Sequence, residues 1–356
     1  MTTTVLFIGD PHFQISNLPE VDLFVVEITK LAYDKQPDLI VIAGDLLHTH
    51  ERLHTTVLNK AHDFVNAMRN ITTTYILVGN HDYTSNTQFL TDSHWMNSMK
   101  KWDNVVIVDR VLHENINGQS FVFTPYVYPG RFVEALQTFG DDSVWKSADC
   151  IFAHQEFEGC KMGAIVSVEG DKWSLNHPLV VSGHIHSRQQ PQENIYYSGT
   201  PLQHSFGESE KNVVAYFEFT KQGGGYKLEE IELKLPRKKI VYLDVDDVDS
   251  FKIPESEDKL RVTVSGNYDQ FKALKKTKKY KQMLEKGIKV VFKPERQSGD
   301  VLSGVCCESE VSDVSTTDFS TVLQSIVIDQ KDPYVLQAYD LIIGGKRTTV
   351  QDIFFL

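Results

Sequence analysis

Five short segments of this sequence carry acidic, histidine and asparagine side chains, and each follows directly after a run of apolar residues. They are Asp10-Pro11-His12, Gly44-Asp45-Leu46-Leu47-His48, Gly79-Asn80-His81-Asp82, Ala153-His154-Gln155-Glu156 and Gly183-His184-Ile185-His186. Imidazole, carboxylate and amide donors without cysteine suit manganese, iron or zinc, and the set is too rich in nitrogen for calcium. The sequence therefore predicts a transition-metal site built from these segments.

Each segment on its own has an ordinary structural explanation. A Gly-Asp pair after a strand is a common turn, a His-x-His pair often lies on one strand face, and Asn-His-Asp would also cap a helix. The joint pattern favours a functional site. Ligands bind beyond the carboxyl ends of strands in α/β sheets, and here five strand ends would deliver these side chains to one rim.

The apolar runs that precede these segments predict the elements that hold them. Continuous apolar runs occupy residues 5–8, 39–43, 75–78, 105–108, 121–123, 151–153 and 179–181. Runs of this length are typical of strands buried on both faces. Apolar residues also recur at helical spacing over residues 18–32 and 53–68. We therefore predict a layered α/β core with sheet inside and helices outside.

The chain divides into a core domain at residues 1–235 and three further parts. Residues 236–296 predict a small α+β unit with a strand at 260–264, a helix over 268–286 and a strand at 288–292. Residues 297–318 lack apolar periodicity and are typical of a linker. Residues 319–356 carry apolar stripes typical of two short amphipathic helices, which would either fold back on the core or dock on a partner.

Composition limits the class of protein. Of 356 residues, 41% are hydrophobic and 24% are charged, which is typical of a globular protein and excludes disordered, collagen-like and coiled-coil chains. No apolar run approaches the ~18 residues that span a bilayer, so no membrane association is expected. The first ten residues lack the basic segment of a secretory signal, and the four cysteines form no Cys-x-x-Cys pair. The expected compartment is a reducing cytoplasm.

Charge is distributed unevenly along the chain. The net charge of −12 argues weakly against a nucleic-acid partner, yet residues 272–296 hold ten lysines and arginines against two glutamates. A charge run of this kind is usually a solvated helix face. In a chain that is otherwise acidic, it also fits a polyanion such as duplex DNA, contacted through its phosphates. The lysines assigned to that contact are Lys275, Lys276, Lys278 and Lys279.

The five segments, in this order, resemble the signature of the calcineurin-like metallophosphoesterases over residues 5–208. The histidine three residues after Asp45 is similar to that of the SbcD-type DNA repair nucleases. The stretch Tyr197-Ser198-Gly199-Thr200-Pro201, followed by Phe206-Gly207-Glu208, resembles the closing motif of those nucleases, and residues 153–170 resemble recombination endonuclease subunits of large phages. The resemblance implies a metallophosphoesterase β-sandwich flanked by helices, a DNA-binding capping domain at 236–296 and a helical partner-binding tail at 319–356.

The same resemblance implies a centre of two divalent metal ions, with Mn²⁺ as the expected metal. One ion would be held by Asp10, His12, Asp45 and His186, and the other by Asp45, Asn80, His154 and His184. Asp45 would bridge the two ions. Two ions roughly 3.5–4 Å apart can clamp the attacking and leaving oxygens of a phosphodiester.

Three further residues are assigned beside the metals. His81 is next to the implied ligand Asn80 and would face the phosphate, where it would stabilise or protonate the leaving oxygen. His48 is the second candidate for that face, with a solvated loop histidine as the alternative. Asp82 would either orient His81 or cap a helix.

By this resemblance the chain is expected to be the DNA nuclease subunit of an SbcCD-like repair or recombination complex. It would act as an exonuclease on duplex ends and as an endonuclease on single strands. Its expected partners are DNA, an ATPase of the SbcC type and a second copy of the chain, and its expected location is the DNA-associated cytoplasm. The alternatives are a metallophosphoesterase for small phosphodiesters or phosphoproteins and a non-catalytic scaffold that recruits the ATPase to DNA.

Overall fold

The computed structural model describes residues 2–50, 52–208, 211–220 and 225–294, together with the single positions Val327 and Tyr339. The predicted linker at 297–318 and, apart from those two positions, the predicted tail at 319–356 lie outside the described residues. No helix in the described ranges is long and apolar enough to span a membrane.

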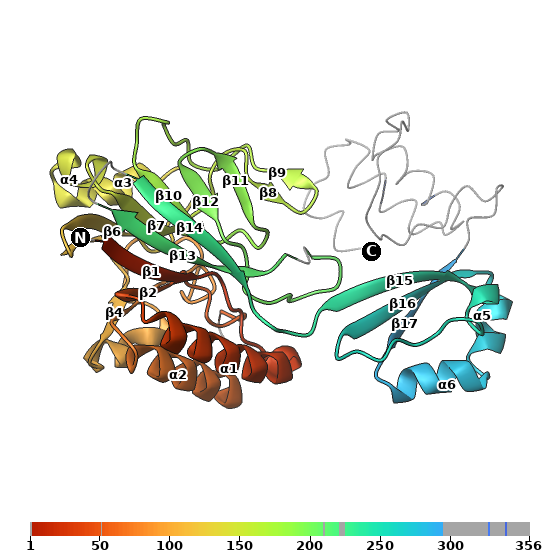
Figure 1. Ribbon diagram of the computed structural model, residues 1–356. Coiled ribbons are helices and arrows are strands. Elements are labelled where there is room, and N and C mark those ends of the chain that lie inside the picture. The colour runs from red at the N-terminus through yellow and green to blue at the C-terminus, as the bar shows by residue number, and fades with distance from the viewer. Residues whose placement is uncertain are drawn as a thin grey trace, which may run out of the picture. The chain divides into compact units, whose positions relative to one another are not determined.

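Two six-stranded sheets form the core domain (Figure 1). The first sheet has the order β14-β13-β1-β2-β3-β4, with strands β1 (Thr2–Ile8), β2 (Leu39–Ile42), β3 (Thr74–Leu77), β4 (Val105–Val108), β13 (Val213–Thr220) and β14 (Gly225–Glu232). The second has the order β11-β12-β10-β7-β6-β5, with strands β5 (Leu112–Ile116), β6 (Gln119–Phe123), β7 (Cys150–His154), β10 (Leu179–Gly183), β11 (Gln189–Gln192) and β12 (Ile195–Tyr197). Strands β1 to β4 are mutually parallel, as are β6, β7, β10 and β12.

The alternation of side chains along β1 explains why its whole run is apolar. Val5 and Phe7 pack into the cluster that joins the two sheets, whereas Leu6 and Ile8 pack on the opposite side against the helices. Helices α1 (Leu18–Lys35) and α2 (Thr55–Arg69) cover that side of the first sheet. The short helices α3 (Phe132–Leu136) and α4 (Asp142–Lys146) contribute to a third cluster on the outer face of the second sheet. The predicted layered α/β fold is confirmed.

Several short elements connect the strands. They are the two-residue strands β8 (Lys161–Met162) and β9 (Ile165–Val166) and the 3-10 helices η1 (Ile15–Asn17), η2 (Trp95–Lys101), η3 (Gln137–Phe139) and η4 (Val245–Asp247). Because β1, β2 and β3 run parallel in one sheet and β7 and β10 run parallel in the other, the carboxyl ends within each set lie at one edge of their sheet.

Residues 238–294 form a separate three-stranded parallel sheet of β15 (Lys238–Asp244), β16 (Lys259–Gly266) and β17 (Lys289–Pro294). Its core contains Val262, Val264, Phe271 and Met283. The single helix expected over residues 268–286 is wrong, because the segment forms two helices, α5 (Tyr268–Leu274) and α6 (Lys278–Glu285). Thr277 starts the second helix, since its hydroxyl accepts a hydrogen bond from the Tyr280 amide at 3.2 Å.

Candidate metal centre

The carboxyl ends of β1, β2, β3, β7 and β10 and the loops that follow them bring all seven predicted ligands together. Two groups of three side chains each place their ligand atoms within 4.8 Å of one another. The first group is Asp10, His12 and His186, and the second is Asp45, His154 and His184. Asn80 joins the second group, because its Oδ1 lies 3.0 Å from His154 Nε2 and 2.9 Å from His184 Nδ1.

Asp45 lies between the two groups. Its Oδ2 is 3.5 Å from His12 Nε2 and 3.4 Å from His154 Nε2. Atoms that share an ion at about 2.0–2.2 Å are separated from each other by roughly 3–3.5 Å, so these spacings suit common ligation. Asp45 is therefore the side chain that faces both candidate ion positions.

The backbone fixes which nitrogen His154 can offer to a metal. Its Nδ1 donates a hydrogen bond to the Ala43 carbonyl oxygen at 2.7 Å, which leaves Nε2 directed at Asp45 and Asn80. His184 presents Nδ1 to Asn80, and its Nε2 is 3.9 Å from Glu156 Oε2. Partners of this kind on the far nitrogen hold metal-ligating imidazoles in one orientation.

Burial and mutual charge shift the pKa values of the ligands strongly. Burial raises the pKa of Asp10 to about 7, although His154 opposes the shift. Burial acts to raise the pKa of Asp45, but His154 and His12 outweigh it and hold that pKa well below its usual range. Burial acts to lower the pKa of His154, but Asp45 and Asp10 outweigh it and raise that pKa to about 9. The histidines therefore compensate the charge of Asp45, whereas the charge of Asp10 is compensated only in part.

The donor set fits divalent cations. Asp10 Oδ1 is buried and has no hydrogen-bond partner among the described residues, and His12 Nε2 faces His186 Nε2 at 3.0 Å. Burial lowers the pKa values of His12, His184 and His186, which favours the neutral imidazole that binds metal. Two aspartates, four imidazoles and one amide oxygen at these spacings would be satisfied by two divalent ions.

Three of the ligands have a strained backbone. Among the described non-glycine residues, φ is positive at His12 (45°), Asp45 (49°) and His184 (79°), three of the seven such positions. L-residues rarely occupy this region, and it costs of order 1–3 kcal/mol per residue. The fold holds these residues in unfavourable conformations that direct their side chains toward one centre.

Two glycines let the ligand carboxylates approach the backbone. A Cβ atom at Gly183 would lie 2.3 Å from Asp10 Oδ1, and one at Gly79 would lie 2.2 Å from Asp45 Oδ1. Both distances are far below van der Waals contact, so no larger residue fits without displacing a ligand. The Gly-His and Gly-Asn pairs of the sequence segments thus have a steric explanation.

His81 and His48 lie beside the predicted ligands. His81 Nδ1 donates to the His48 carbonyl oxygen at 2.7 Å, and the His81 amide donates to Asp45 Oδ1 at 2.8 Å. The rings of His48 and His81 stack with centroids 5.6 Å apart, and both neighbour His12. His12, His48 and His81 also place ring nitrogens within 4.8 Å, so His81 is close enough to the centre to contact either substrate or metal.

Asp82 has partners that differ from both sequence alternatives. Its Oδ2 accepts from the Gly79 amide at 3.0 Å, and its Oδ1 accepts from Trp95 Nε1 at 2.9 Å. Within the described residues it forms no hydrogen bond with the His81 side chain, and no helix begins there among the described elements. Burial raises the pKa of Asp82 to about 7, with Asp45 adding to the rise. Asp82 therefore fixes the turn that presents Asn80.

The structure places three further residues at the centre, beyond those predicted from the sequence. His50 stacks on His81 with ring centroids 4.5 Å apart, and His204 lies with its centroid 5.1 Å from that of His12. Glu156 approaches His184 as described above. Of the three, only Glu156 lies inside one of the five segments, two residues after the predicted ligand His154. That position could have indicated its place at the centre. His50 and His204 follow from loop packing alone.

The stacking of His50 on His81 gives a testable expectation. The variant His50→Ala should lower kcat for a small phosphodiester about 2- to 10-fold, because an aromatic pair contributes roughly 0.5–1.5 kcal/mol to holding His81 in place. The variant His50→Phe preserves the ring and should retain the activity. Steady-state kinetics and metal content would be measured together. A phenylalanine variant as slow as the alanine variant would show that the ring nitrogens matter instead of the stacking.

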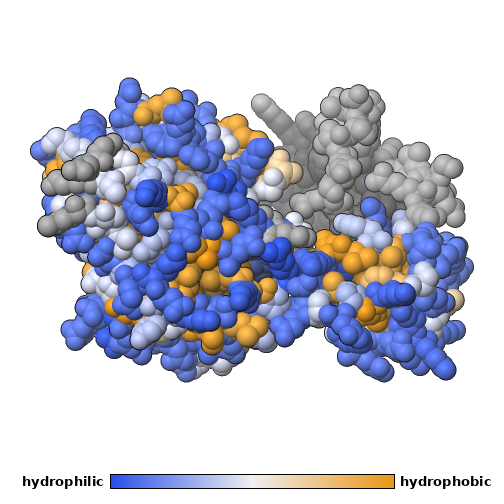
Figure 2. Space-filling model, in the orientation of Figure 1, coloured by the Kyte–Doolittle hydropathy of each residue, from blue (hydrophilic) through white to orange (hydrophobic). Residues whose placement is uncertain are grey.

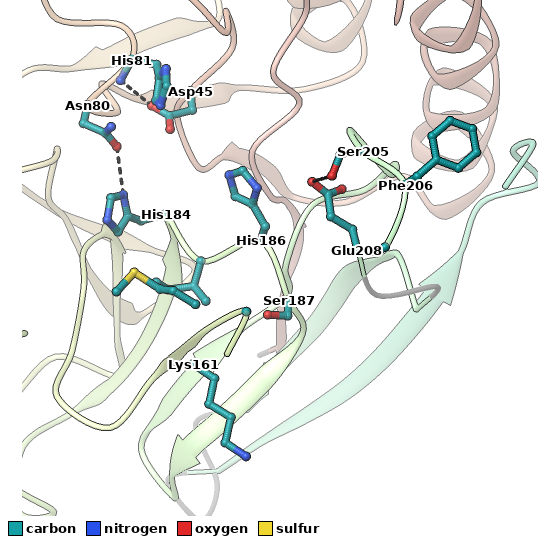
Figure 3. Close-up of a pocket in the computed structure, with 14 residues that line it drawn as sticks. Asp45, Asn80, His81, Lys161, His184, His186, Ser187, Ser205, Phe206 and Glu208 are labelled. Carbon is teal, nitrogen blue, oxygen red and sulfur yellow. Dashed lines mark hydrogen bonds between the residues drawn. The ribbon is translucent and has the colours of Figure 1, made fainter. Parts of the chain in front are cut away.

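A cavity of about 560 Å³ opens beside the ligands (Figure 3). Asp45, Asn80, His184 and His186 contribute to its wall. Ser205 and Glu208, the latter from the closing motif, lie across His186 from Asn80. Glu208 accepts hydrogen bonds from the His204 amide at 2.7 Å and from Ser205 Oγ at 3.0 Å. The predicted metal ligands therefore border an accessible space rather than a sealed core.

The four lysines assigned to DNA lie elsewhere, around the turn from α5 to α6. Lys275, Lys276 and Lys278 are exposed, and Lys279 is partly exposed. Lys278 and Lys279 occupy the first turn of α6, and this turn contains no acidic residue. Lysine is unfavourable at this end of a helix because the peptide dipoles make it positive. The arrangement costs helix stability and presents an electropositive surface.

The chain matches known proteins over most of this structure. The Metallophos profile, described as calcineurin-like phosphoesterase, matches residues 3–188. "Putative phosphoesterase 078R" of Invertebrate iridescent virus 3 is 46% identical over 308 residues, which cover 85% of this chain and 88% of that protein. "Putative phosphoesterase 244L" of Invertebrate iridescent virus 6 is 48% identical over 278 residues, covering 77% of this chain and 98% of that protein.

The resemblance to a solved structure is weaker. GAP50, the anchor in the inner membrane complex of Plasmodium, aligns with a TM-score of 0.35 and 12% identity over 65% of this chain and 89% of that one. A likeness at that level carries no argument about the chain. The profile and the two viral relatives do identify the family, and the profile match contains all five predicted ligand segments. The chain therefore belongs to the calcineurin-like phosphoesterase family.

Proposed function

We propose that this protein is a Mn²⁺-dependent DNA phosphodiesterase of the SbcD type. The observation that carries the proposal is the convergence of Asp10, His12, Asp45, Asn80, His154, His184 and His186 beside an open cavity. The unpaired lysines around the turn from α5 to α6, Lys275, Lys276, Lys278 and Lys279, support DNA as the substrate. Duplex ends and single strands are the proposed forms of that substrate.

The chemistry separates into metal binding and substrate handling. Two divalent ions, when bound, would activate the attacking water and neutralise charge on the phosphate. His81 handles the leaving oxygen, because the His48 carbonyl holds its Nδ1 proton and leaves Nε2 for the substrate. His50 and His48 keep the His81 ring in this orientation by stacking.

The lysine cluster supports a phosphate-rich substrate. No ion pair with Lys275, Lys276, Lys278 or Lys279 is present among the residues that the structure describes. Lys275 Nζ lies over the Phe271 ring at 4.8 Å, so its charge faces an aromatic ring instead of a carboxylate. Lys278 and Lys279 lie at the positive end of the α6 dipole, where their charges destabilise the helix. A bound phosphate would compensate these charges.

A second candidate is hydrolysis of small phosphodiesters. The cavity of about 560 Å³ falls within the range of roughly 300–1,000 Å³ that small-molecule sites occupy. The two candidates separate in one assay of the purified chain with added Mn²⁺, on plasmid and oligonucleotide DNA and on bis-p-nitrophenyl phosphate. Mn²⁺-dependent cutting of DNA supports the nuclease. Hydrolysis of the small ester alone would contradict it, and no turnover of either would point to a scaffold.

Neutralising the lysine cluster should weaken duplex binding. Changing Lys275, Lys276, Lys278 and Lys279 to glutamine should reduce the slope of log K against log salt by up to ~0.9 per lost phosphate contact. Hydrolysis of bis-p-nitrophenyl phosphate should hardly change, because these lysines are not among the cavity residues. The measurement is fluorescence anisotropy of labelled duplex across a salt series.

A matched control for that variant uses four exposed lysines of the core domain. They are Lys30, Lys101, Lys172 and Lys227. Their change to glutamine alters the net charge equally, so their salt slope should stay near that of the wild type. Equal slopes for both quadruple variants would show that Lys275, Lys276, Lys278 and Lys279 form an ordinary solvated surface and not a DNA contact.

The proposed partners include an ATPase of the SbcC type and a second copy of the chain. The ATPase would bind the segment 319–356, which carries apolar stripes in the sequence and which, apart from Val327 and Tyr339, lies outside the described residues. Removing residues 318–356 should abolish co-purification with the ATPase while Mn²⁺-dependent cutting of single strands persists. Loss of that basal cutting would instead assign the segment to the core.

A further inference from the structure

A small hairpin beside the cavity exposes an unusual amount of apolar surface. Strands β8 and β9 pair antiparallel through Met162 and Ile165, and Val168 follows. The exposed fractions are 39% for Met162, 67% for Ile165, 49% for Val166 and 78% for Val168. Figure 2 shows hydrophobic surface over the position that β8 and β9 hold in Figure 1. Exposed apolar groups gathered in this way are typical of a contact surface.

The hairpin is firmly attached despite its exposure. The Lys161 amide donates to Gln189 Oε1 at 2.7 Å, and Gln189 Nε2 donates back to the Lys161 carbonyl at 2.8 Å. Ser167 accepts at its carbonyl from the Gly159 amide at 2.9 Å, and its amide donates to the Cys160 carbonyl at 2.8 Å. The apolar side chains are therefore presented on a fixed support.

The same hairpin belongs to the wall of the catalytic cavity. Lys161, Met162 and Gly163 line the cavity together with the ligands Asp45 and His184. The Ser167 hydroxyl also donates a hydrogen bond of 2.5 Å to Glu156, which approaches His184. A substrate held at the metal ligands would therefore extend past this hairpin.

We propose that the segment 161–168 is an apolar wedge that packs against the bases next to the scissile phosphate. This inference rests on the proposed function as a DNA phosphodiesterase. The metal ligands and His81 supply polar contacts for the phosphate, whereas Ile165, Val166 and Val168 offer none. In a nucleic acid the apolar surfaces are base faces, and side chains such as isoleucine and methionine insert between base steps and unstack them. The wedge opens a duplex end and directs one strand into the cavity.

The test uses a variant that keeps the fold and removes the apolar tip. It carries Ile165→Ser, Val166→Ser and Val168→Ser, three exposed positions. The matched control carries Val26→Ser and Leu175→Ser, which remove side chains that are 64% and 65% exposed elsewhere. Each protein is assayed with Mn²⁺ on a blunt duplex, on the same duplex with three mismatched terminal pairs, and on bis-p-nitrophenyl phosphate.

The wedge predicts a substrate-dependent loss. The triple variant should cut the blunt duplex about tenfold more slowly, because unstacking a base step costs a few kcal/mol that the wedge would offset. The mismatched end should restore its rate, and the small ester and the control variant should be unaffected. A second readout is 2-aminopurine at the end of the duplex, bound in the His81→Ala background so that it is not cut. Its fluorescence should rise when the bound protein carries the unchanged hairpin, and it should stay low when the protein carries the three serine substitutions.

The outcomes distinguish the wedge from the proposed function. DNA cutting that is equal in wild type and triple variant overturns the wedge alone, as does an equal loss on the small ester. Both are overturned if the wild-type protein does not cut DNA and the His81→Ala protein with the unchanged hairpin does not raise the fluorescence. A triple variant with unchanged cutting but a changed oligomeric state in sedimentation would make the hairpin a contact between copies, and one that loses co-purification with the ATPase would make it a partner contact.

Discussion

Replacing His81 with alanine is expected to lower the rate of phosphodiester hydrolysis by about 10²- to 10⁴-fold while both metal ions stay bound. The reason is geometric. His81 Nδ1 is occupied by the His48 carbonyl, and His81 contacts Asp45 through its backbone amide, which alanine retains. The measurements are kcat on bis-p-nitrophenyl phosphate and metal content by elemental analysis after gel filtration.

Asp45→Ala is the comparison that gives the His81 result its meaning. Asp45 Oδ2 faces both His12 and His154, so its loss should remove or weaken both ions as well as activity. His81 also lies within the group formed by His12 and His48, where it could act as a ligand itself. If His81→Ala lost metal as completely as Asp45→Ala, His81 would be a metal ligand and not the group that serves the leaving oxygen.

Gly183→Ala is expected to weaken metal binding at the predicted centre, although it replaces none of the predicted ligands. The added Cβ would meet Asp10 Oδ1 at 2.3 Å and the Ala43 Cβ at 2.8 Å, so one or both must move. We expect metal affinity to fall about 10- to 100-fold, as when a partner of a ligand is displaced, and stability to fall by about 1–3 kcal/mol. Isothermal titration with Mn²⁺ and urea unfolding of the metal-free chain measure the two effects separately.

Gly225→Ala is the matched control for that substitution. A Cβ atom at Gly225 would have nothing within 4 Å, and its backbone φ lies outside the left-handed region. The control should therefore bind Mn²⁺ like the wild type. Unchanged affinity in Gly183→Ala as well would mean that Asp10 has room to shift, and that the close approach at Gly183 does not position it.

The positions of the candidate ligands could be proposed from the sequence because each depends on a local pattern. Continuous apolar runs such as those of β1 and β2 fix where a buried strand ends, and Asp10 and Asp45 follow those ends directly. The order of the five segments supplied the family, and the profile match supports that assignment. Local patterns failed at Thr277, where one hydroxyl divides a stretch of helical periodicity in two.

The partners of the residues around the ligands could not be predicted in the same way. Whether Asp82 meets His81 or Trp95, and whether His50 stacks on His81, depends on how loops from different strands pack. The position of the exposed hairpin at 161–168 beside the cavity likewise depends on tertiary packing and could not be predicted from the sequence.

The sequence by itself determined the strand ends, the ligand types and the charge of residues 272–296, since these depend on neighbours along the chain. Only the tertiary structure decided that Asp45 faces both groups of ligands and that the His48 carbonyl, not Asp82, orients His81. The physical reason is that a hydrogen bond or a shared ion requires atoms to meet within about 3.5 Å. Residues 33 or more positions apart in the chain reach such distances only after their strands have paired in one sheet, as for His48 and His81, or after the two sheets have packed face to face, as for Asp45 and His154.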